Sequence, residues 1–115
     1  MATGEAHYDR AVDCIAEGDL DGAVAAYRDA LAIDADYADA LEGLSMVLAD
    51  LGRFDEAIAA AERAAALMPE EILSYTNVSR IYQRAGDVPK AEEWAAKGRL
   101  LDWKQQLKDG KPPAA

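Results

Sequence analysis

The segments GDLDGA (18–23), GRFDEA (52–57) and GDVPKA (86–91) share one pattern of residue types. Each begins with a glycine, has an apolar residue two positions later and ends on an alanine five positions after the glycine. The pattern is typical of a tight turn between two helices, because glycine adopts the left-handed conformation that ends a helix without a steric penalty.

The three turns recur at a fixed interval along the chain. Gly18, Gly52 and Gly86 are separated by the same step of 34 in the numbering, which we call the repeat period. The same period separates the apolar residues and the alanines of the pattern, namely Leu20, Phe54 and Val88, and Ala23, Ala57 and Ala91. A fixed period of this length indicates a repeat array, in which each unit buries its apolar face only by stacking on its neighbours.

Each unit is predicted to contain two antiparallel helices that cross closely at the small alanine of the turn. In the second unit, leucines at helical spacing lead up to Gly52, and we expect Asp55 to cap the following helix. That helix should end before Pro69, because proline has no amide hydrogen to donate. In the third unit Asp87 is expected to be the cap, with Pro89 in the first turn.

The sequence therefore predicts an all-α fold of six helices in three pairs. We expect the chain to be frayed at its two ends, residues 1–3 and 110–115. A chain of 115 residues is too short for two independent cores, so we expect one domain. The expected helices are 5–17, 21–34, 38–51, 55–68, 72–85 and 89–107.

Helix-turn-helix units of this length, with glycine and proline at these helix ends, resemble the tetratricopeptide repeat (TPR) family. The family pattern runs W-x2-L-G-x2-Y, then A-x3-F, then P. The resemblance implies a single TPR domain over residues 1–115, folded as a right-handed α-solenoid. Its repeats would be 4–37, 38–71 and 72–105, followed by the end of the last helix and a disordered tail at 106–115. The residues that match the family pattern are Ala23 and Tyr27, then Leu41, Leu44, Ala57 and Pro69, then Tyr75, Tyr82 and Ala91.

Several positions depart from the family pattern. Arg10 and Cys14 stand at a leucine and a tyrosine place of the first unit, and Trp103 replaces the proline that would close the third. Ala61 and Ala95 replace the usual large aromatic residue. Each single match is weak, but three turns in the same register are a strong signal.

The resemblance implies a concave groove, lined by the first helix of each unit, that holds a peptide or a segment of another protein. The groove would be apolar and acidic at one end and basic at the other, so we expect an acidic segment flanked by an apolar residue as ligand. The matching positions are Tyr8, Val12 and Ile15, then Glu42, Met46 and Asp50, then Leu73, Thr76, Asn77, Arg80, Gln83 and Arg84.

The best-known TPR ligand site is a clamp of basic and amide side chains on the terminal carboxylate of a chaperone. The matching places here hold Tyr8, Val12, Gly43, Leu73 and Asn77. Four of the five clamp groups are therefore missing, and we expect a TPR domain of another kind.

Some of these groove residues have an alternative structural interpretation. Arg80 and Arg84 carry guanidinium groups that suit a carboxylate, but Arg84 can equally pair with Asp50 on the neighbouring helix. Met46 is either a ligand contact or a packing residue.

The two residues of the first helix that could carry chemistry are also interpreted as structural. Cys14 is expected to be buried, since no histidine or basic residue is placed to activate its thiol. His7 is expected to be a packing residue rather than a switch.

The net charge of −10 is unevenly distributed. Residues 1–71 carry 4 Lys/Arg against 17 Asp/Glu, whereas residues 72–115 carry 8 against 5. An acidic body repels phosphate, so nucleic acid is not expected as a partner. The sequence has no apolar run long enough for membrane insertion, no secretory signal in MATGEAHYDR and a single cysteine, which together favour the cytoplasm.

The sequence offers no constellation for catalysis. The single histidine and single cysteine lie seven residues apart on one predicted helix, which is too far for a dyad. No glycine-rich phosphate loop and no metal-ligand spacing occur. We therefore expect neither an enzyme nor a cofactor nor a metal.

The last helix is predicted to run on through AKGRLLDWKQQLKD (96–109). Ala96, Leu100, Trp103 and Leu107 fall on one stripe of it, with Lys97, Lys104 and Lys108 beside the stripe. One interpretation is that Trp103 packs against the third hairpin and caps the array. The other is a protein contact, either in a two-fold dimer or head-to-tail with the acidic first repeat of another copy.

Two hypotheses for function follow. In the first, the protein is a non-catalytic interaction module, an adaptor or small chaperone, that holds a segment of a partner in its groove. In the second, it is a self-assembling module that forms a homodimer or larger homo-oligomer through its last helix and its oppositely charged ends.

Overall fold

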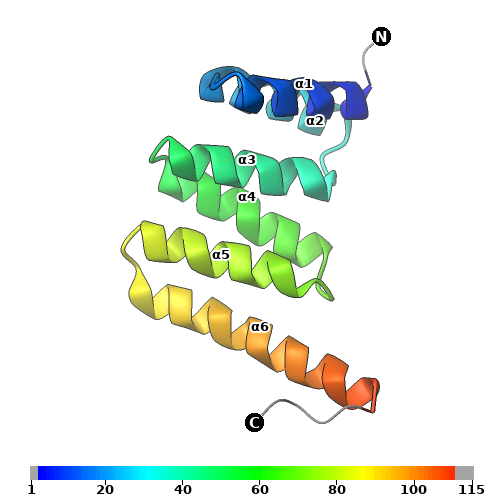
Figure 1. Ribbon diagram of the computed structural model, residues 1–115, viewed down its shortest axis with the longest axis vertical. Coiled ribbons are helices and arrows are strands. Elements are labelled where there is room, and N and C mark those ends of the chain that lie inside the picture. The colour runs from blue at the N-terminus through cyan, green and yellow to red at the C-terminus, as the bar shows by residue number, and fades with distance from the viewer. Residues whose placement is uncertain (1–2, 111–115) are drawn as a thin grey trace.

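The computed structural model describes residues 3–110 as six α-helices stacked in an elongated array (Figure 1). Each predicted helix agrees with the structure to within a single residue at either end. The described part of the chain contains no strand, so the all-α prediction is confirmed. The helices are α1 (Gly4–Ala16), α2 (Leu20–Ile33), α3 (Ala38–Asp50), α4 (Phe54–Leu67), α5 (Ile72–Arg84) and α6 (Val88–Lys108).

The recurring glycines end the first helix of each hairpin as predicted. Gly18, Gly52 and Gly86 have φ values of 77°, 77° and 88°, in the left-handed region. The amide of the residue after each glycine donates to the carbonyl oxygen five residues earlier, at 2.8, 2.8 and 2.9 Å. These bonds satisfy carbonyl groups that the end of a helix would otherwise leave unpaired. One turn geometry is therefore repeated three times.

The helices that follow these turns begin in two different ways. The carboxylate of Asp87 accepts a hydrogen bond from the amide of Lys90 at 3.2 Å, and Pro89 lies in the first turn, so both predictions for α6 are confirmed. The prediction that Asp55 caps α4 is wrong. Helix α4 begins one residue earlier, with Arg53 at the N-cap and no side-chain cap, so Asp55 lies inside the first turn.

Frayed ends were predicted at residues 1–3 and 110–115, of which the structure describes Thr3 and Gly110. The prediction is wrong at both. The Thr3 hydroxyl accepts a hydrogen bond from the amide of Ala6 at 3.0 Å, which caps α1. The amide of Gly110 donates to the carbonyl of Leu107 at 3.1 Å, so the chain forms a turn there. Residues 1–2 and 111–115, on which the rest of that prediction falls, lie outside the described residues.

The hairpins stack because the second helix of each packs on the first helix of the next: α2 lies against α3, and α4 against α5. The alanines of the three turns are buried, which agrees with their expected role at the helix crossing. Between the first two hairpins, Tyr27 is buried against Gly43. A Cβ atom at position 43 would overlap atoms of the Tyr27 ring, so only glycine allows this approach.

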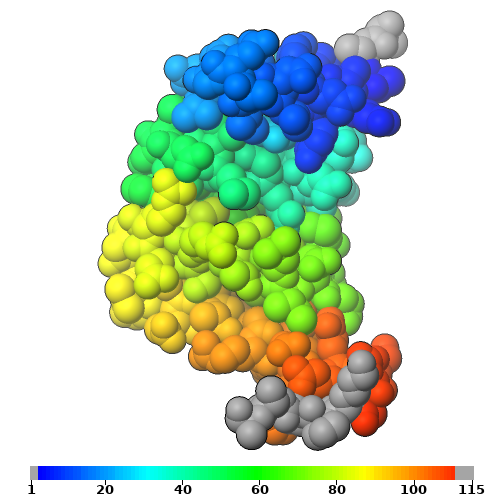
Figure 2. Space-filling model, in the orientation of Figure 1, coloured from blue at the N-terminus to red at the C-terminus, as the bar shows by residue number. Residues whose placement is uncertain are grey.

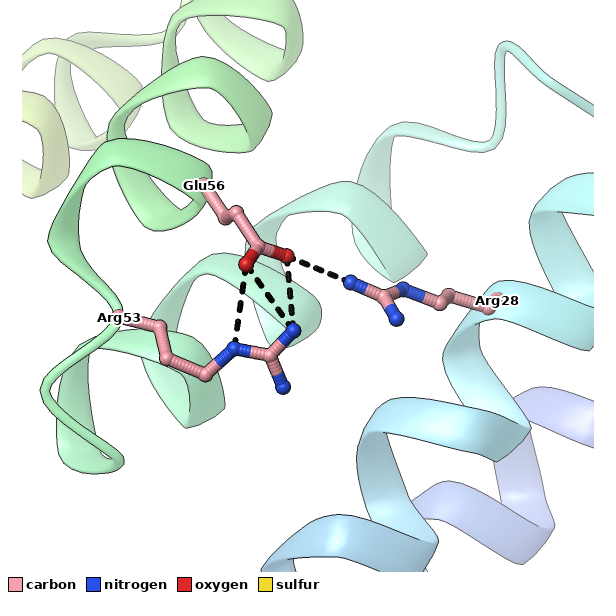
Figure 3. A network of polar contacts seen from close by, with 3 residues as sticks. All are labelled: Arg28, Arg53 and Glu56. Carbon is pink, nitrogen blue, oxygen red and sulfur yellow. Dashed lines mark hydrogen bonds and ion pairs between the residues drawn. The ribbon is translucent and has the colours of Figure 1, made fainter.

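Polar contacts reinforce the stack from outside. Glu56 of α4 accepts hydrogen bonds from Arg53 in the preceding turn, and also from Arg28 of α2 at 2.7 Å (Figure 3). These two guanidinium groups hold the pKa of the Glu56 carboxyl below its usual value, with the Arg53 hydrogen bond as the largest cause. All three side chains are about half exposed, so the network fixes geometry more than it adds stability.

No helix among residues 3–110 has both the length and the apolar character needed to cross a membrane.

Candidate protein-binding face

The first helices of the three hairpins, α1, α3 and α5, follow one another down one side of the stack (Figure 1). We call the solvent-facing side of these three helices the first-helix face. All the residues predicted for the groove lie on these three helices. The structure separates them into those that are free to meet a ligand and those that are already engaged with the protein itself.

Apolar side chains are exposed on each of the three helices. Val12 and Ile15 on α1 are 45% and 40% exposed, Met46 on α3 is 50% exposed, and Leu73 on α5 is 55% exposed. Val12 and Met46 occupy the same place in successive repeats, since they lie one repeat period apart. The next place in this row is Arg80, which is also exposed. The packing interpretation of Met46 is therefore wrong, because half of its surface is in solvent.

The two arginines of the face differ in their partners. Arg84 pairs with Asp50 of α3 at 3.0 Å, and it also donates to the carbonyl of Ala49 at 3.4 Å. Arg80 makes no ion pair with any other residue in the described range 3–110. The structural alternative for Arg84 is thus confirmed, and Arg80 is the cation that remains available on this face.

Two predicted groove residues are engaged with the protein itself, and a third is half-buried. Glu42 accepts a hydrogen bond from the hydroxyl of Ser74 at 2.8 Å, which ties α3 to α5. Tyr8 is half-buried, with its ring stacked on Tyr37 at 5.5 Å and edge-on to Tyr27 at 5.6 Å. Asn77 is half-buried.

The remaining groove positions lie on α5. The hydroxyl of Thr76 donates to the carbonyl of Ile72 at 3.4 Å within the same helix. Gln83 is exposed one turn beyond Arg80, so its amide extends the polar end of the first-helix face.

The expectation that Cys14 is buried is wrong in degree. Its side chain is partly exposed while it packs against the core. His7 is partly buried, and its Nδ1 atom has no hydrogen-bond partner among the described residues. The two residues lie seven positions apart along α1. Within residues 3–110, no group of three or more His, Cys, Asp and Glu side chains could hold a metal ion.

Helix α6 carries a second exposed apolar surface. Leu100, Trp103 and Leu107 are 54%, 51% and 57% exposed. The interpretation that Trp103 packs against the third hairpin as a cap is therefore wrong. Its position opposite the buried side of α6, which includes Ala91 and Gly98, turns the indole towards solvent. We call Ala96, Leu100, Trp103 and Leu107 the apolar stripe.

A cavity of about 510 Å³ lies beside α6 and was not predicted. Its walls include Pro69 and Tyr75 from the region where α4 passes into α5, and Leu101 and Lys104 from α6. Gln105 closes one side by donating to the carbonyl of Glu70 at 2.8 Å. Nothing in the sequence signals this cavity, because it depends on how the long α6 crosses the preceding loop.

Acidic residues on α1 and at its C-cap, Glu17, form a second feature that was not predicted. Glu5, Asp9, Asp13 and Glu17 recur at intervals of four, and all four are exposed. Residues four apart lie on one side of a helix, so we call these four residues the acidic ladder. The interval alone could have revealed it.

The three stacked hairpins define an α-helical repeat protein. The family model described as tetratricopeptide repeat matches residues 15–75, which is more than half of the chain. The protein therefore belongs to the TPR family, as its residue pattern predicted. A comparison with curated protein sequences gave no match.

Solved structures of similar fold include other TPR proteins. A crystal structure of MamA protein has a TM-score of 0.87 and 24% identity over 98% of this chain and 61% of its own. YrrB, described as a TPR protein with an unusual peptide-binding site, has a TM-score of 0.80 and 20% identity over 88% of this chain and 52% of its own. The second TPR of Spaghetti (RPAP3), bound to the HSP90 peptide SRMEEVD, has a TM-score of 0.77 and 18% identity over 86% of this chain and 92% of its own.

At these identities the likeness shows the fold alone. The chain spans about three fifths of the MamA chain and about half of the YrrB chain. What it shares with them is the fold of stacked helical hairpins.

Proposed function

We propose that the first-helix face binds an extended segment of a partner protein in which apolar residues are followed by an acidic residue. The observation that carries this proposal is the row formed by Val12, Met46 and Arg80 at equivalent places of three successive repeats. Two exposed apolar side chains and one exposed cation, which forms no ion pair within residues 3–110, lie along the stack in that order.

The row favours one orientation of the segment. Val12, Ile15 and Met46 would contact apolar side chains at the α1 and α3 end, where burial of such surface drives association. At the α5 end, Arg80 would bind a carboxylate through its planar guanidinium group, with Gln83 beside it as a further donor. Arg84 contributes less than its charge suggests, since Asp50 already neutralises it.

We infer that the carboxylate comes from an internal Asp or Glu side chain rather than from a chain terminus. Among the five places that match the chaperone clamp, Tyr8 is engaged with other tyrosine rings and Gly43 lies under Tyr27. Val12 and Leu73 are apolar. A protein of this kind would act as a non-catalytic adaptor or small chaperone, and the cytoplasm is the compartment that we expect for it.

Selection from a random peptide library displayed on phage tests the proposal. The wild type is compared with a face variant, Met46→Glu with Arg80→Glu. A matched control, Leu100→Glu with Arg99→Glu, makes the same change of charge and a similar loss of apolar surface on α6 instead.

We expect the wild type and the control to enrich peptides with apolar residues followed by Asp or Glu, and the face variant to enrich none of them. Circular dichroism must show that all three proteins are equally helical. Enrichment of basic peptides, or retention of the acidic ones by the face variant, would reject the proposed site.

A second candidate function is self-assembly into a homodimer or larger homo-oligomer. The observation that favours it is the exposure of more than half of Leu100, Trp103 and Leu107 on α6, away from the first-helix face. This candidate and the peptide-binding proposal use different surfaces, so the face variant and its control separate them.

A further inference from the structure

The cavity beside α6 exists because this helix is longer than its counterparts. Helices α2 and α4 end at Ile33 and Leu67, whose place in the third unit is Leu101, but α6 continues to Lys108. The extension lies at the opposite end of the stack from α1 (Figure 2). It passes the loop between α4 and α5, and the cavity of about 510 Å³ lies between this loop and the helix. None of the residues around the cavity was predicted for the groove.

The cavity continues into a smaller one of about 280 Å³ between α4 and α6. The two cavities share Pro69, Tyr75 and Lys97 in their walls, so we treat them as one and call it the α6 cleft. Its smaller end is lined by Ala66 of α4 and Trp94 of α6. From Trp94 to the end of α6 the cleft extends over about 21 Å of helix, long enough for a chain-like ligand.

The walls of the α6 cleft favour a ligand without hydrogen-bonding groups along its length. Two backbone carbonyls that a bound peptide could use are already occupied: that of Pro69 accepts from the Tyr75 hydroxyl at 3.0 Å, and that of Glu70 accepts from Gln105 at 2.8 Å. The amide hydrogens of a peptide buried here would lack acceptors, which is costly. A hydrocarbon chain has no such requirement.

Positive charge is available at the wide end of the cleft. Lys104 and Lys108 lie one helical turn apart and make no ion pair with another residue within the range 3–110. Lys97, nearer the middle, already lies 3.8 Å from Glu93. Glu70 also lines the wide end, so the two free lysines exceed the carboxylates there by a single charge. This excess suits one anionic group rather than a run of acidic residues.

We propose that the α6 cleft binds a free carboxylate that carries one unbranched hydrocarbon chain, such as a fatty acid. Lys104 and Lys108 hold the carboxylate. The chain lies over Tyr75 and Leu101 and ends beside Ala66, so that its polarity matches that of the cleft. This site is separate from the first-helix face and takes a different class of ligand.

Calorimetry of the full chain with dodecanoate, below its micelle concentration, tests the proposal. Each methylene that the cleft buries should tighten binding about fourfold. We therefore expect one dodecanoate per protein, bound at least about tenfold more tightly than octanoate, since part of the chain stays in contact with solvent. Dodecyltrimethylammonium has the same chain and the opposite charge, and it should bind at least about tenfold more weakly than dodecanoate.

A pair of variants tests the position of the carboxylate. Lys104→Gln with Lys108→Gln should weaken dodecanoate binding about tenfold or more, because the anion loses its charged donors. The matched control is Lys90→Gln with Arg99→Gln, which removes the same charge from α6 at positions outside the cleft walls. The control should bind dodecanoate as the wild type does.

A third variant tests the position of the chain. Ala66→Phe fills the smaller end of the cleft, so dodecanoate should bind no more tightly than octanoate, while the affinity for octanoate should stay unchanged. All five positions changed in these variants are exposed, so each protein should keep the helical circular dichroism of the wild type.

Three results would overturn the proposal. A wild type that binds no dodecanoate shows that the cleft is not a site for it. Equal binding of dodecanoate and dodecyltrimethylammonium, or equal loss in the lysine variant and its control, shows adsorption without a defined carboxylate site. Sedimentation with vesicles of phosphatidylcholine and phosphatidylserine in equal parts gives the third: vesicle binding that is lost in the lysine variant shows a contact with a lipid surface instead.

Discussion

The phenol hydroxyl of Tyr82 on α5 donates a hydrogen bond to the carboxylate of Glu62 on α4, joining the second hairpin to the third. The bond and partial burial raise the pKa of Tyr82 to about 12, with the hydrogen bond as the larger cause. The acceptor is an ionised group, so the bond is stronger than one between neutral partners. It is one of the polar ties that fix how one repeat sits on the next.

The Tyr82 pKa gives a pH-dependent prediction. A tyrosine whose pKa is higher in the folded than in the unfolded chain contributes stability that is complete below pH 10 and decreases as the pH rises towards about 12. We expect Tyr82→Phe to lower the free energy of unfolding by about 1 kcal/mol at pH 8, because Glu62 loses its donor. The difference between the two proteins should shrink above pH 10. Urea unfolding of both proteins across this range measures it, and a constant difference would contradict the assignment.

Gly43 should tolerate no side chain. A Cβ atom there would overlap the buried ring of Tyr27, so we expect Gly43→Ala to cost about 1 to 3 kcal/mol in stability. Gly98→Ala is the matched control, because the new Cβ would meet the Cβ of Tyr75 at an ordinary 3.4 Å and alanine favours the helix. Thermal unfolding should show the first variant destabilised and the second unchanged or stabilised. Equal effects would mean that Tyr27 moves aside freely.

The turn glycines are required by backbone conformation rather than by space. Gly52 has φ of 77°, and among residues 3–110 no atom beyond its two chain neighbours lies within 4 Å of the place that a Cβ atom would take. Gly52→Val should therefore destabilise by about 1 kcal/mol or more, through strain alone. Gly52→Asn should cost less, since asparagine enters the left-handed region more readily. Chemical denaturation that finds the asparagine variant less stable than the valine variant would disprove this explanation.

Asp50 partly neutralises the positive charge of the first-helix face, because it pairs with Arg84. Its carboxylate pairs with Arg84 at 3.0 Å, and both side chains are about half exposed. Asp50→Asn should change stability by less than about 1 kcal/mol, as expected for an exposed pair. It should strengthen binding of the acidic peptides selected by the wild type, because Arg84 becomes available beside Arg80. Fluorescence titration with one such peptide checks this, and weaker binding would show that Asp50 itself contacts the ligand.

The fold could be predicted from the sequence because it depends on local signals repeated three times. Gly18, Gly52 and Gly86 fix the turns through a backbone conformation that other residues avoid, and the constant repeat period fixes the stacking. The prediction for Asp55 failed because the N-cap of α4 is Arg53, two positions earlier, and propensity alone does not determine such a boundary.

The candidate site was less predictable, because side-chain partners depend on the distance between helices. The sequence placed Arg80 and Arg84 on one face. Only the structure shows that Arg84 forms an ion pair with Asp50, whereas Arg80 has no ion-pair partner among residues 3–110. It likewise left the role of Trp103 open until the exposure of its ring showed that it is not a buried cap. The burial of Tyr8 among other tyrosines also depends on contacts between hairpins.

Methyl NMR of methionine-labelled protein tests the central claim, that the first-helix face is the binding site, most directly. Met46 lies exposed in the middle of that face, whereas Met68, at the end of α4, serves as the internal reference. On titration with a peptide selected by the wild type, the Met46 methyl signal should shift and saturate while the Met68 signal stays in place. A peptide that binds by calorimetry but leaves the Met46 signal unmoved would contradict the account.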